Sequence, residues 1–224
     1  KKIICGDDIK ILVLDEADEM LSEGFRESVY NIFQLLNVNI QVALFTATLP
    51  NNIYNITTKF MRDPVKICVK SESLTLEGIL QYFVAINNDN EKYLTLKNIY
   101  SFISLSQCII YCNSVNRVIK LYEEMKNDGF PVSFIHSNMD KFTREESFKE
   151  FKTGSSRVLI STDITSRGID IQQVSVVINF DLPKCVHKYL HRIGRSGRWG
   201  RKGVGINLIT RYDVEHLRTI EKHY

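Results

Sequence analysis

Short apolar runs rich in isoleucine and valine recur along the whole chain, and amphipathic stretches separate them. Most of these runs do not alternate between apolar and polar residues, which is typical of parallel strands buried on both faces. They lie at residues 9–15, 41–47, 65–69, 81–86, 107–112, 132–136, 157–162, 174–180 and 205–210. Because strands that alternate with helices favour a parallel sheet covered on both sides, we expect a doubly wound α/β fold.

The intervening segments carry helical patterns and one break. Two of the predicted helices end at a glycine, Gly129 and Gly154, the residue that most often follows a helix. Residues 70–77 are polar and have no clear period, which predicts a linker. Three predicted strands precede this linker and six follow it. We therefore expect residues 1–69 to be the C-terminal part of one α/β domain and residues 78–224 to be a complete second domain.

Composition limits the class of protein but not its function. Of the 224 residues, 44% are hydrophobic and 25% are charged, values that are ordinary for a folded soluble protein. No apolar run approaches the ~20 residues needed to cross a bilayer. The five cysteines are odd in number and scattered, which favours free thiols in a reducing compartment. We expect an intracellular protein, cytoplasmic or nuclear. The net charge of +3 is too small to indicate nucleic-acid binding by itself.

Two acidic residues, Asp15 and Glu16, follow directly after the first apolar run in the segment LVLDEADEML. A carboxylate at the end of a buried strand can hold Mg²⁺ beside the phosphates of a nucleotide. A second carboxylate there can orient or deprotonate the attacking water. The same two residues also suit the N-terminus of the next helix. Both interpretations are open from these residues alone.

A basic segment with regularly spaced glycines lies near the C-terminus. Between Lys184 and Lys202 the chain has lysine or arginine at 184, 188, 192, 195, 198, 201 and 202, and no acidic residue. Guanidinium groups bind phosphate through paired hydrogen bonds and keep their charge. Glycines at 194, 197 and 200 allow the backbone to approach a ligand closely. A solvated basic surface is the alternative, but it does not predict the glycine spacing.

Four segments together resemble the motifs of the DEAD-box RNA helicases. Asp15-Glu16-Ala17-Asp18 resembles motif II of that family. Three further matches are Thr46-Ala47-Thr48 to motif III, STDITSRGID at 161–170 to motif V, and HRIGRSGR at 191–198 to motif VI. The flanking segments look particularly like the initiation factor 4A subfamily, and the resemblance runs from Lys1 to Tyr224. It implies RecA-like doubly wound sheets, with ATP and Mg²⁺ as cofactors.

The resemblance implies catalytic roles for individual residues. Asp15 would hold Mg²⁺ through a water molecule, and Glu16 would activate the attacking water. Arg195 and Arg198 would be arginine fingers on the γ-phosphate of ATP, and Asp170 would contact the ribose. An arginine finger is worth roughly 10³–10⁵ in rate.

The resemblance also implies RNA contacts and a coupling between domains. The RNA contacts fall on Asn113, Arg144, Thr162 and Gly168. The residues that would couple the two domains are Asp18, Thr46, Thr48 and His191. The two threonine hydroxyls are expected to hydrogen-bond the acidic loop. Residues 136–144 depart from the family pattern, because Ser137 stands where glycine is usual and Lys141 where glutamine is usual. Lys141 can still meet a phosphate, as a point charge.

The function that the resemblance implies is ATP-dependent RNA unwinding, in translation initiation or RNA processing. Two lobes would close around ATP and single-stranded RNA, which would be held largely without sequence preference. The protein would be a monomer that responds to protein regulators of closure. An alternative from another class is an ATP-gated RNA clamp of the exon-junction type, with little turnover. A generic α/β hydrolase would leave the four spaced motifs as coincidence.

One expected element is absent from the sequence. No GxxxxGK[ST] segment occurs, although a lysine and backbone N–H groups of that kind cradle the phosphates of a nucleotide. The chain begins only a few residues before the DEAD segment, and we expect it to be a fragment that lacks the front of the first domain. These 224 residues alone are predicted to hydrolyse ATP negligibly.

Overall fold

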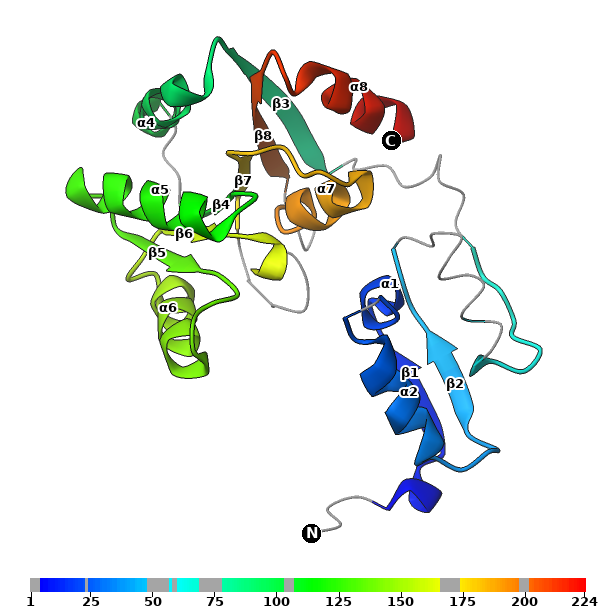
Figure 1. The fold of residues 1–224 in the computed structure, drawn as a ribbon. Helices are drawn as coiled ribbons and strands as arrows, with labels where there is room; N and C mark the ends of the chain where they lie inside the picture. The colour runs from blue at the N-terminus through cyan, green and yellow to red at the C-terminus, as the bar shows by residue number, and fades with distance from the viewer. Residues whose placement is uncertain are drawn as a thin grey trace. The chain divides into compact units, whose positions relative to one another are not determined.

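The computed structural model describes residues 5–22, 24–47, 57, 60–68, 78–102, 107–165, 174–197 and 202–224. The chain divides into two compact units, an N-terminal unit of Lys1–Cys68 and a C-terminal unit of Val69–Tyr224 (Figure 1). Among the residues described, no helix is long and apolar enough to cross a membrane.

The N-terminal unit is built on two parallel strands. The elements are η1 (Gly6–Asp8), β1 (Ile11–Leu14), α1 (Ala17–Met20), α2 (Arg26–Gln34) and β2 (Gln41–Leu44). In the parallel register, Ile11 lies opposite Gln41 and Leu14 opposite Leu44. The buried core is small, and it consists of Leu14, Ala17, Leu21 and Val29. These residues come from the end of β1 and from the two helices, so one side of the strand pair is covered.

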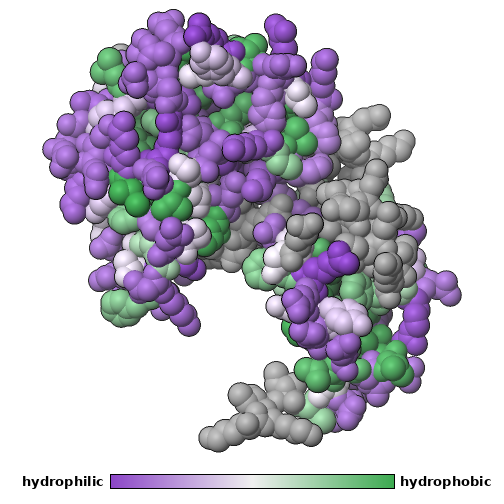
Figure 2. Space-filling view, viewed as in Figure 1, coloured by the Kyte–Doolittle hydropathy of each residue, from purple (hydrophilic) through white to green (hydrophobic). Residues whose placement is uncertain are grey.

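Other apolar residues of this unit are exposed. Ile11 and Val13, which alternate with the inward residues of β1, are 57% and 55% exposed. Figure 2 shows hydrophobic side chains at the surface of this unit around α2 and β2. The strand predicted at 65–69 is wrong for its described part, since residues 64–68 form no strand, and Val65 and Ile67 are 89% and 91% exposed. A strand needs a neighbour to accept and donate its backbone hydrogen bonds, and among the described residues of this unit only β1 and β2 pair.

The C-terminal unit contains a six-stranded sheet in the order β3-β8-β7-β4-β6-β5. All five pairings are parallel. The strands are β3 (Ile79–Ile86), β4 (Cys108–Tyr111), β5 (Val132–Ile135), β6 (Val158–Ser161), β7 (Val176–Asn179) and β8 (Gly203–Thr210). Every residue of β4, β6 and β7 is buried. Burial on both faces explains why these apolar runs do not alternate, and the predicted doubly wound α/β fold is confirmed.

Helices cover both faces of this sheet. α4 (Lys92–Phe102) and α5 (Val115–Asn127) pack on one face through residues that include Leu96, Leu121 and Met125. α6 (Lys141–Thr153), α7 (Val186–Ile193) and α8 (Val214–His223) pack on the other through residues that include Phe151, Ile193 and Ile220. Two short 3₁₀ turns, η3 (Asp89–Glu91) and η4 (Asp163–Thr165), follow β3 and β6. The predicted glycines end their helices with φ of +80° at Gly129 and +81° at Gly154, which only glycine adopts without strain.

The topology predicts where a ligand would bind. β4 and β7 are neighbours, but the helix after β4 lies on one face of the sheet and the helix after β7 lies on the other. This is a topological switch point, and ligands of open α/β sheets bind outside the carboxyl ends of the strands at such points. The carboxyl edge of the C-terminal unit is therefore the place to look for its site.

Candidate functional site

In the N-terminal unit, Asp15 and Glu16 lie in the sharp turn between β1 and α1. The turn is fixed on both sides, because the Phe45 N–H donates to the Leu14 carbonyl at 2.8 Å and the Ala17 N–H donates to the Phe45 carbonyl at 2.9 Å. Glu16 has φ 50° and ψ 47°, the left-handed region that costs a residue other than glycine free energy. Backbone strain of this kind is concentrated at functional sites.

The two carboxylates have different surroundings. Asp15 is exposed, and its Oδ1 accepts the Glu16 N–H at 2.9 Å. Glu16 is the residue before α1, but its side chain makes no capping hydrogen bond. The alternative that both acids cap and charge the helix N-terminus is therefore met only in part, since Glu16 makes no capping hydrogen bond but both carboxylates directly precede α1.

The exposed carboxylate of Asp15 fits a magnesium ion. Mg²⁺ prefers oxygen ligands and is commonly held by one or two carboxylates, with water and substrate phosphates completing its coordination. One oxygen of Asp15 takes a single backbone hydrogen bond, which leaves lone pairs available. Among the residues that the structure describes, no group of three or more His, Cys, Asp or Glu is placed to hold a metal. Asp15 is the residue of this turn that would hold such a cation, with water and substrate phosphates as further ligands.

The acidic turn is joined to the strand beside it. Thr46, just after β2, donates a hydrogen bond from Oγ1 to Oδ1 of Asp18 at 3.0 Å. Asp18 is 8% exposed, so this hydrogen bond is largely shielded from water. The predicted hydrogen bond between a threonine hydroxyl and the acidic loop is confirmed for Thr46. Thr48 lies outside the described residues.

In the C-terminal unit, the carboxyl edge is organised around Arg192, whose side chain is fully buried. The guanidinium lies over the Tyr111 ring, 5.1 Å from its centroid. Its nitrogens donate to Asp163 Oδ1 at 2.6 Å, the Asp181 carbonyl at 2.7 Å, Asn113 Oδ1 at 2.8 Å and Asn179 Oδ1 at 3.2 Å. These acceptors lie in or just after β4, β6 and β7, so one side chain joins three neighbouring strands to α7.

Sequence reasoning missed this role, because Arg192 was grouped with the basic residues that face phosphate. Burial acts to raise the pKa of Asp163, but Arg192 and Lys188 outweigh it, and the pKa lies below its ordinary value. Asp163 therefore stays ionised and pairs with a cation inside the protein. A signal was available in the sequence, since Asp163 lies two residues after the apolar run that forms β6, and a carboxylate that is partly buried at such a place is stabilised by a positively charged partner.

The predicted RNA contacts after β4 and β6 lie at the same edge of the sheet. Asn113 follows β4 and Thr162 follows β6, the adjacent strand. The Asn113 amide donates to the Leu182 carbonyl at 2.8 Å and accepts from Arg192, so its side chain is held by the protein. Gly168 and the proposed ribose contact Asp170 lie outside the described residues.

Arg144 lies in α6 and supports the loop after β5. Its Nη2 donates to the Met139 carbonyl at 2.9 Å and to the Ser137 carbonyl at 3.3 Å. Lys141 is exposed and lies 3.8 Å from Glu145 on the next turn of the helix. The loop that departs from the family pattern is thus held by Arg144, the residue that matches it.

The basic segment packs closely against its own sheet. His191 is half-buried near the end of α7, and Arg195 is 6% exposed. At Gly197, with φ +72°, an added Cβ would lie 3.0 Å from both the Gly203 nitrogen and the Gly78 carbonyl oxygen. This glycine is needed because the protein's own backbone approaches it. Arg198 lies outside the described residues.

Two family models match the chain, one in each unit. The model described as DEAD/DEAH box helicase matches residues 3–56, and the model described as helicase conserved C-terminal domain matches residues 91–200. The ATP-dependent RNA helicase eIF4A of Saccharomyces cerevisiae (strain YJM789) is 52% identical over 218 residues, which cover 97% of this chain and 55% of that protein. The chain spans about half the length of the curated relatives that it matches.

Two solved structures are also similar. S. cerevisiae Dbp5 bound to RNA and ADP BeF3 has a TM-score of 0.92 at 32% identity, covering 97% of this chain and 57% of that one. The C-terminal domain of the DEAD-box protein Dbp5 has a TM-score of 0.61 at 34% identity, covering 66% of this chain and 87% of that one. The first family model covers the acidic turn after β1. The second covers most of the six-stranded sheet and most of the basic segment that includes α7. The chain belongs to the DEAD-box family of RNA helicases and is similar in sequence to the initiation factor 4A branch of that family.

Proposed function

We propose that the protein containing this chain is an ATP-dependent RNA helicase that couples ATP binding and hydrolysis to RNA binding and local unwinding, in translation initiation or RNA processing. The observation that carries the proposal is the strained turn at Glu16, which holds two carboxylates at the end of β1 and is hydrogen-bonded through Asp18 to Thr46. Support comes from relatives named as ATP-dependent RNA helicases and from the similar Dbp5 structure bound to RNA and ADP BeF3.

The carboxylates have separate proposed tasks. Asp15 would hold Mg²⁺, and a cation bound there would neutralise charge that develops on the transferred phosphate. Glu16 accepts a proton from the attacking water and orients it. The backbone hydrogen bonds on either side of the turn keep both groups at the strand end, so little freedom is lost when the substrate binds.

Arginines of the C-terminal unit have the complementary task. Arg195 and Arg198 stabilise the negative charge on the γ-phosphate, and Asp170 contacts the ribose. Arg195 comes three residues after Arg192, the buried side chain that fixes α7 to the carboxyl edge of the sheet. This anchoring gives the proposed arginine fingers a rigid base, which an electrostatic contribution to catalysis requires.

RNA binding and ATP binding favour each other in this proposal. Asn113, Arg144, Thr162 and Gly168 contact phosphates and 2′-hydroxyls, which gives little sequence preference. Asp18, Thr46, Thr48 and His191 carry the coupling between the domains. Because coupling of binding free energies is reciprocal, RNA must tighten ATP binding by the same factor as ATP tightens RNA binding.

The proposal is tested with Glu16→Gln in the full-length protein. Loss of a general base typically costs 10²–10⁴ in rate, so RNA-stimulated ATP turnover is expected to fall at least ~100-fold, with RNA affinity retained. Multiple-turnover unwinding of a short duplex should fall in parallel. Glu27→Gln, on the exposed surface of α2, is the matched control and should leave turnover unchanged. Full activity in Glu16→Gln contradicts the assignment.

The 224-residue chain alone is expected to hydrolyse ATP negligibly. It contains no GxxxxGK[ST] segment to cradle the phosphates, although both carboxylates are present. A phosphate-release assay with and without single-stranded RNA measures this directly. RNA-stimulated turnover by these residues would show that the chain binds the phosphates in another way.

A further inference from the structure

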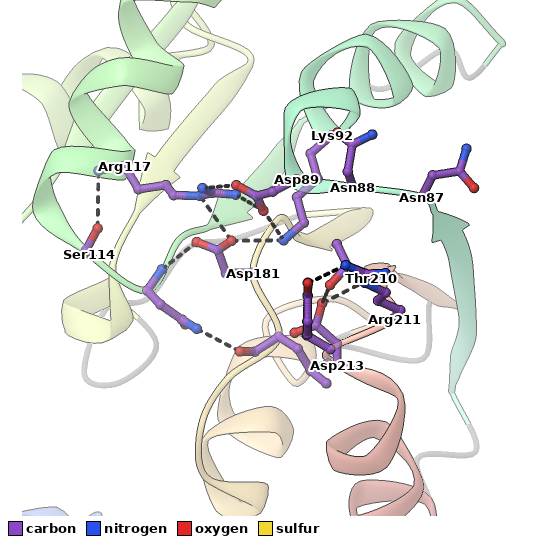
Figure 3. Close-up of a pocket in the computed structure, with 13 residues that line it drawn as sticks. Asn87, Asn88, Asp89, Lys92, Ser114, Arg117, Asp181, Thr210, Arg211 and Asp213 are labelled. Atoms are coloured by element: carbon purple, nitrogen blue, oxygen red, sulfur yellow. Dashed lines mark hydrogen bonds and ion pairs between the residues drawn. The ribbon is translucent and has the colours of Figure 1, made fainter.

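A cavity of about 520 Å³ opens at the carboxyl ends of β3, β8, β7 and β4 (Figure 3). Part of its wall comes from Asn113 and Ser114, which follow β4, and from Asp181, which follows β7. The rest comes from two loops to which neither the motifs nor the proposed mechanism assigns a role. These loops are residues 87–89 after β3 and residues 211–213 after β8.

The floor of the cavity is a charge-balanced set of ion pairs. Lys92, which is 3% exposed, lies 3.1 Å from Asp181 and 3.2 Å from Asp89. Arg117 pairs with Asp89 through both terminal nitrogens and with Asp181 through Nε at 3.1 Å. Figure 3 shows these pairs between Ser114 on one side and Arg211 on the other. Two cations neutralise two anions here, so the floor favours a neutral polar group over a phosphate.

The rim carries an aromatic ring beside an arginine. Tyr212 is 78% exposed, and the Arg211 guanidinium lies 4.7 Å from the centroid of its ring. Arg211 also donates to the Tyr212 hydroxyl at 2.5 Å. Asp213 lines the same cavity, but its Oδ2 accepts the Thr210 N–H at 2.9 Å and the Thr210 hydroxyl at 2.7 Å, and no ion pair joins it to Arg211 among the described residues. Exposed aromatic rings and guanidinium planes are the surfaces on which unpaired bases stack in single-stranded nucleic-acid sites. A guanidinium without a carboxylate partner is available for a phosphate.

The rim is close to the predicted RNA contacts. β7 alone separates β8 from β4 in the sheet, so the ends of these two strands are about 10 Å apart. The end of β7, which lies between them, is joined to the end of β4, because Asp181 Oδ2 accepts the Asn113 N–H at 3.1 Å. A strand of RNA that contacts the end of β4 therefore passes within reach of Tyr212.

We propose that this cavity is a nucleobase subsite, in which one base of single-stranded RNA stacks on Tyr212 while the adjacent phosphate pairs with Arg211. The polar groups of residues 87–89 line the wall beside the edge of that base. The neutral floor suits an uncharged heterocycle, and the arginine on the rim suits the phosphate next to it. The subsite rests on the proposed function, since it extends the RNA contacts of the C-terminal unit from β4 to β8.

The test measures binding of the whole 224-residue chain to a labelled single-stranded oligouridylate by fluorescence anisotropy. Stacking on an aromatic side chain is worth about 1–3 kcal/mol per base, so Tyr212→Ala is expected to weaken binding roughly 5- to 150-fold. Tyr212→Phe keeps a stacking ring and should recover most of that loss. Tyr30→Ala, which removes an exposed tyrosine from α2, is the matched control and should bind like the wild type.

Abasic RNA separates stacking from other effects. An oligonucleotide with an abasic site at the contacting position should bind the wild type as weakly as intact RNA binds Tyr212→Ala, and the variant should not lose further affinity for it. Crosslinking of 4-thiouridine to Tyr212 should identify that position. Wild-type affinity of Tyr212→Ala, with a loss in Arg144→Ala, would overturn the subsite and leave the proposed function in place. Absence of RNA binding by the full-length wild type in the presence of ATP would instead contradict the proposed function. Binding of a protein partner that Tyr212→Ala abolishes, with RNA affinity unchanged, would also overturn the subsite.

Discussion

The two units contain similar apolar strands but bury them to different extents. In the C-terminal unit all four residues of β4 are buried, because helices cover both faces of the sheet. In the N-terminal unit only the last residue of β1 is buried, and its alternate residues Ile11 and Val13 remain more than half exposed. The sequences of the two strands, ILVL and CIIY, do not reveal this difference. Burial is decided by what packs on the strand.

The charged residues of the recognised motifs also differ in exposure between the two units. The N-terminal unit presents an exposed carboxylate at Asp15 on a strained turn, which suits contact with a ligand. The C-terminal unit buries the charge of Arg192 and uses it to join three strands to α7. A charged residue in a recognised motif can therefore be a contact to the ligand or a part of the core, and burial distinguishes the two.

The largest expected loss of stability is that of the C-terminal unit in Arg192→Met. The substitution removes the fully buried guanidinium and the hydrogen bonds that it donates to Asp163, Asn113 and Asn179. Asp163 is 29% exposed and keeps Lys188 at 3.2 Å, but the buried acceptor Asn179 loses its donor, so we expect about 3–5 kcal/mol, the typical cost of removing one partner of a buried ion pair. Hydrogen exchange measured by mass spectrometry should show lost protection in β4, β6 and β7, with β1 and β2 unchanged. Arg218→Met, on the exposed side of α8, is the matched control, and its effect should stay within about 0.5 kcal/mol. Equal effects of the two variants would contradict the internal role of Arg192.

A pair of identical truncations tests the difference in burial directly. Ile110→Ala, in the fully buried β4, is expected to destabilise the C-terminal unit by about 2–5 kcal/mol. Ile11→Ala, at a position 57% exposed in β1, is expected to cost less than about 1 kcal/mol. Urea denaturation followed by hydrogen exchange in each unit gives both values. A large loss in Ile11→Ala would show that the outer face of β1 is covered in solution.

Removing the hydrogen bond between Thr46 and Asp18 should destabilise the N-terminal unit by a smaller amount. Thr46→Val removes the donor to Asp18 at nearly constant side-chain volume, and hydrogen bonds to charged groups contribute about 1.5–3 kcal/mol. Protection of the amides in α1 should fall while that in the C-terminal unit stays unchanged. Thr46→Ser, which keeps the hydroxyl, should retain most of the protection. If the amides of α1 are as well protected from exchange in Thr46→Val as in the wild type, the hydrogen bond does not hold the turn.

The smallest expected effect is the pH dependence of stability that comes from the ion pairs of Asp89 at the floor of the cavity. The hydrogen bonds from Arg117, followed by those from Lys92, lower the pKa of Asp89 from 3.8 to about 2. Because this pKa is depressed on folding, the ion pairs stabilise the C-terminal unit above about pH 4, and their contribution is lost as the pH falls toward 2. Asp89 is 52% exposed, so solvent screening limits the contribution to about 1 kcal/mol or less.

Asp89→Asn should therefore remove part of the acid sensitivity of the C-terminal unit and leave that of the N-terminal unit unchanged. Urea midpoints at several values between about pH 2 and pH 6 provide the measurement. Arg117→Gln should remove the same component, since it deletes the other partner. An unchanged pH profile in both variants would show that these ion pairs contribute nothing in solution.

Most of the fold was predictable because its signals are local. Non-alternating apolar runs predicted the parallel strands of the C-terminal unit, and Gly129 and Gly154 predicted the ends of α5 and α6. The run at 65–69 produced a wrong prediction, because residues 64–68 form no strand although their composition suits one. Propensity alone does not supply the neighbouring strand that a ladder of hydrogen bonds requires.

The candidate site was only partly predictable. The acidic turn and its hydrogen bond to Thr46 follow from residues that lie close to strand ends. The role of Arg192 did not follow, since its acceptors lie as far as 79 positions away in the chain. Nor did any local pattern mark Arg211 and Tyr212, whose position at the cavity rim depends on the order of strands in the sheet.

By itself the sequence determined the class of fold, the strand and helix segments of the C-terminal unit, and the family to which the chain belongs. These depend on periodicity and on motifs, which are properties of residues near one another in the chain. The tertiary structure decided which charges are buried, which apolar faces are covered and which loops meet at the carboxyl edge. Burial and proximity depend on contacts between residues distant in sequence, and such contacts exist only once the sheet has assembled in its order.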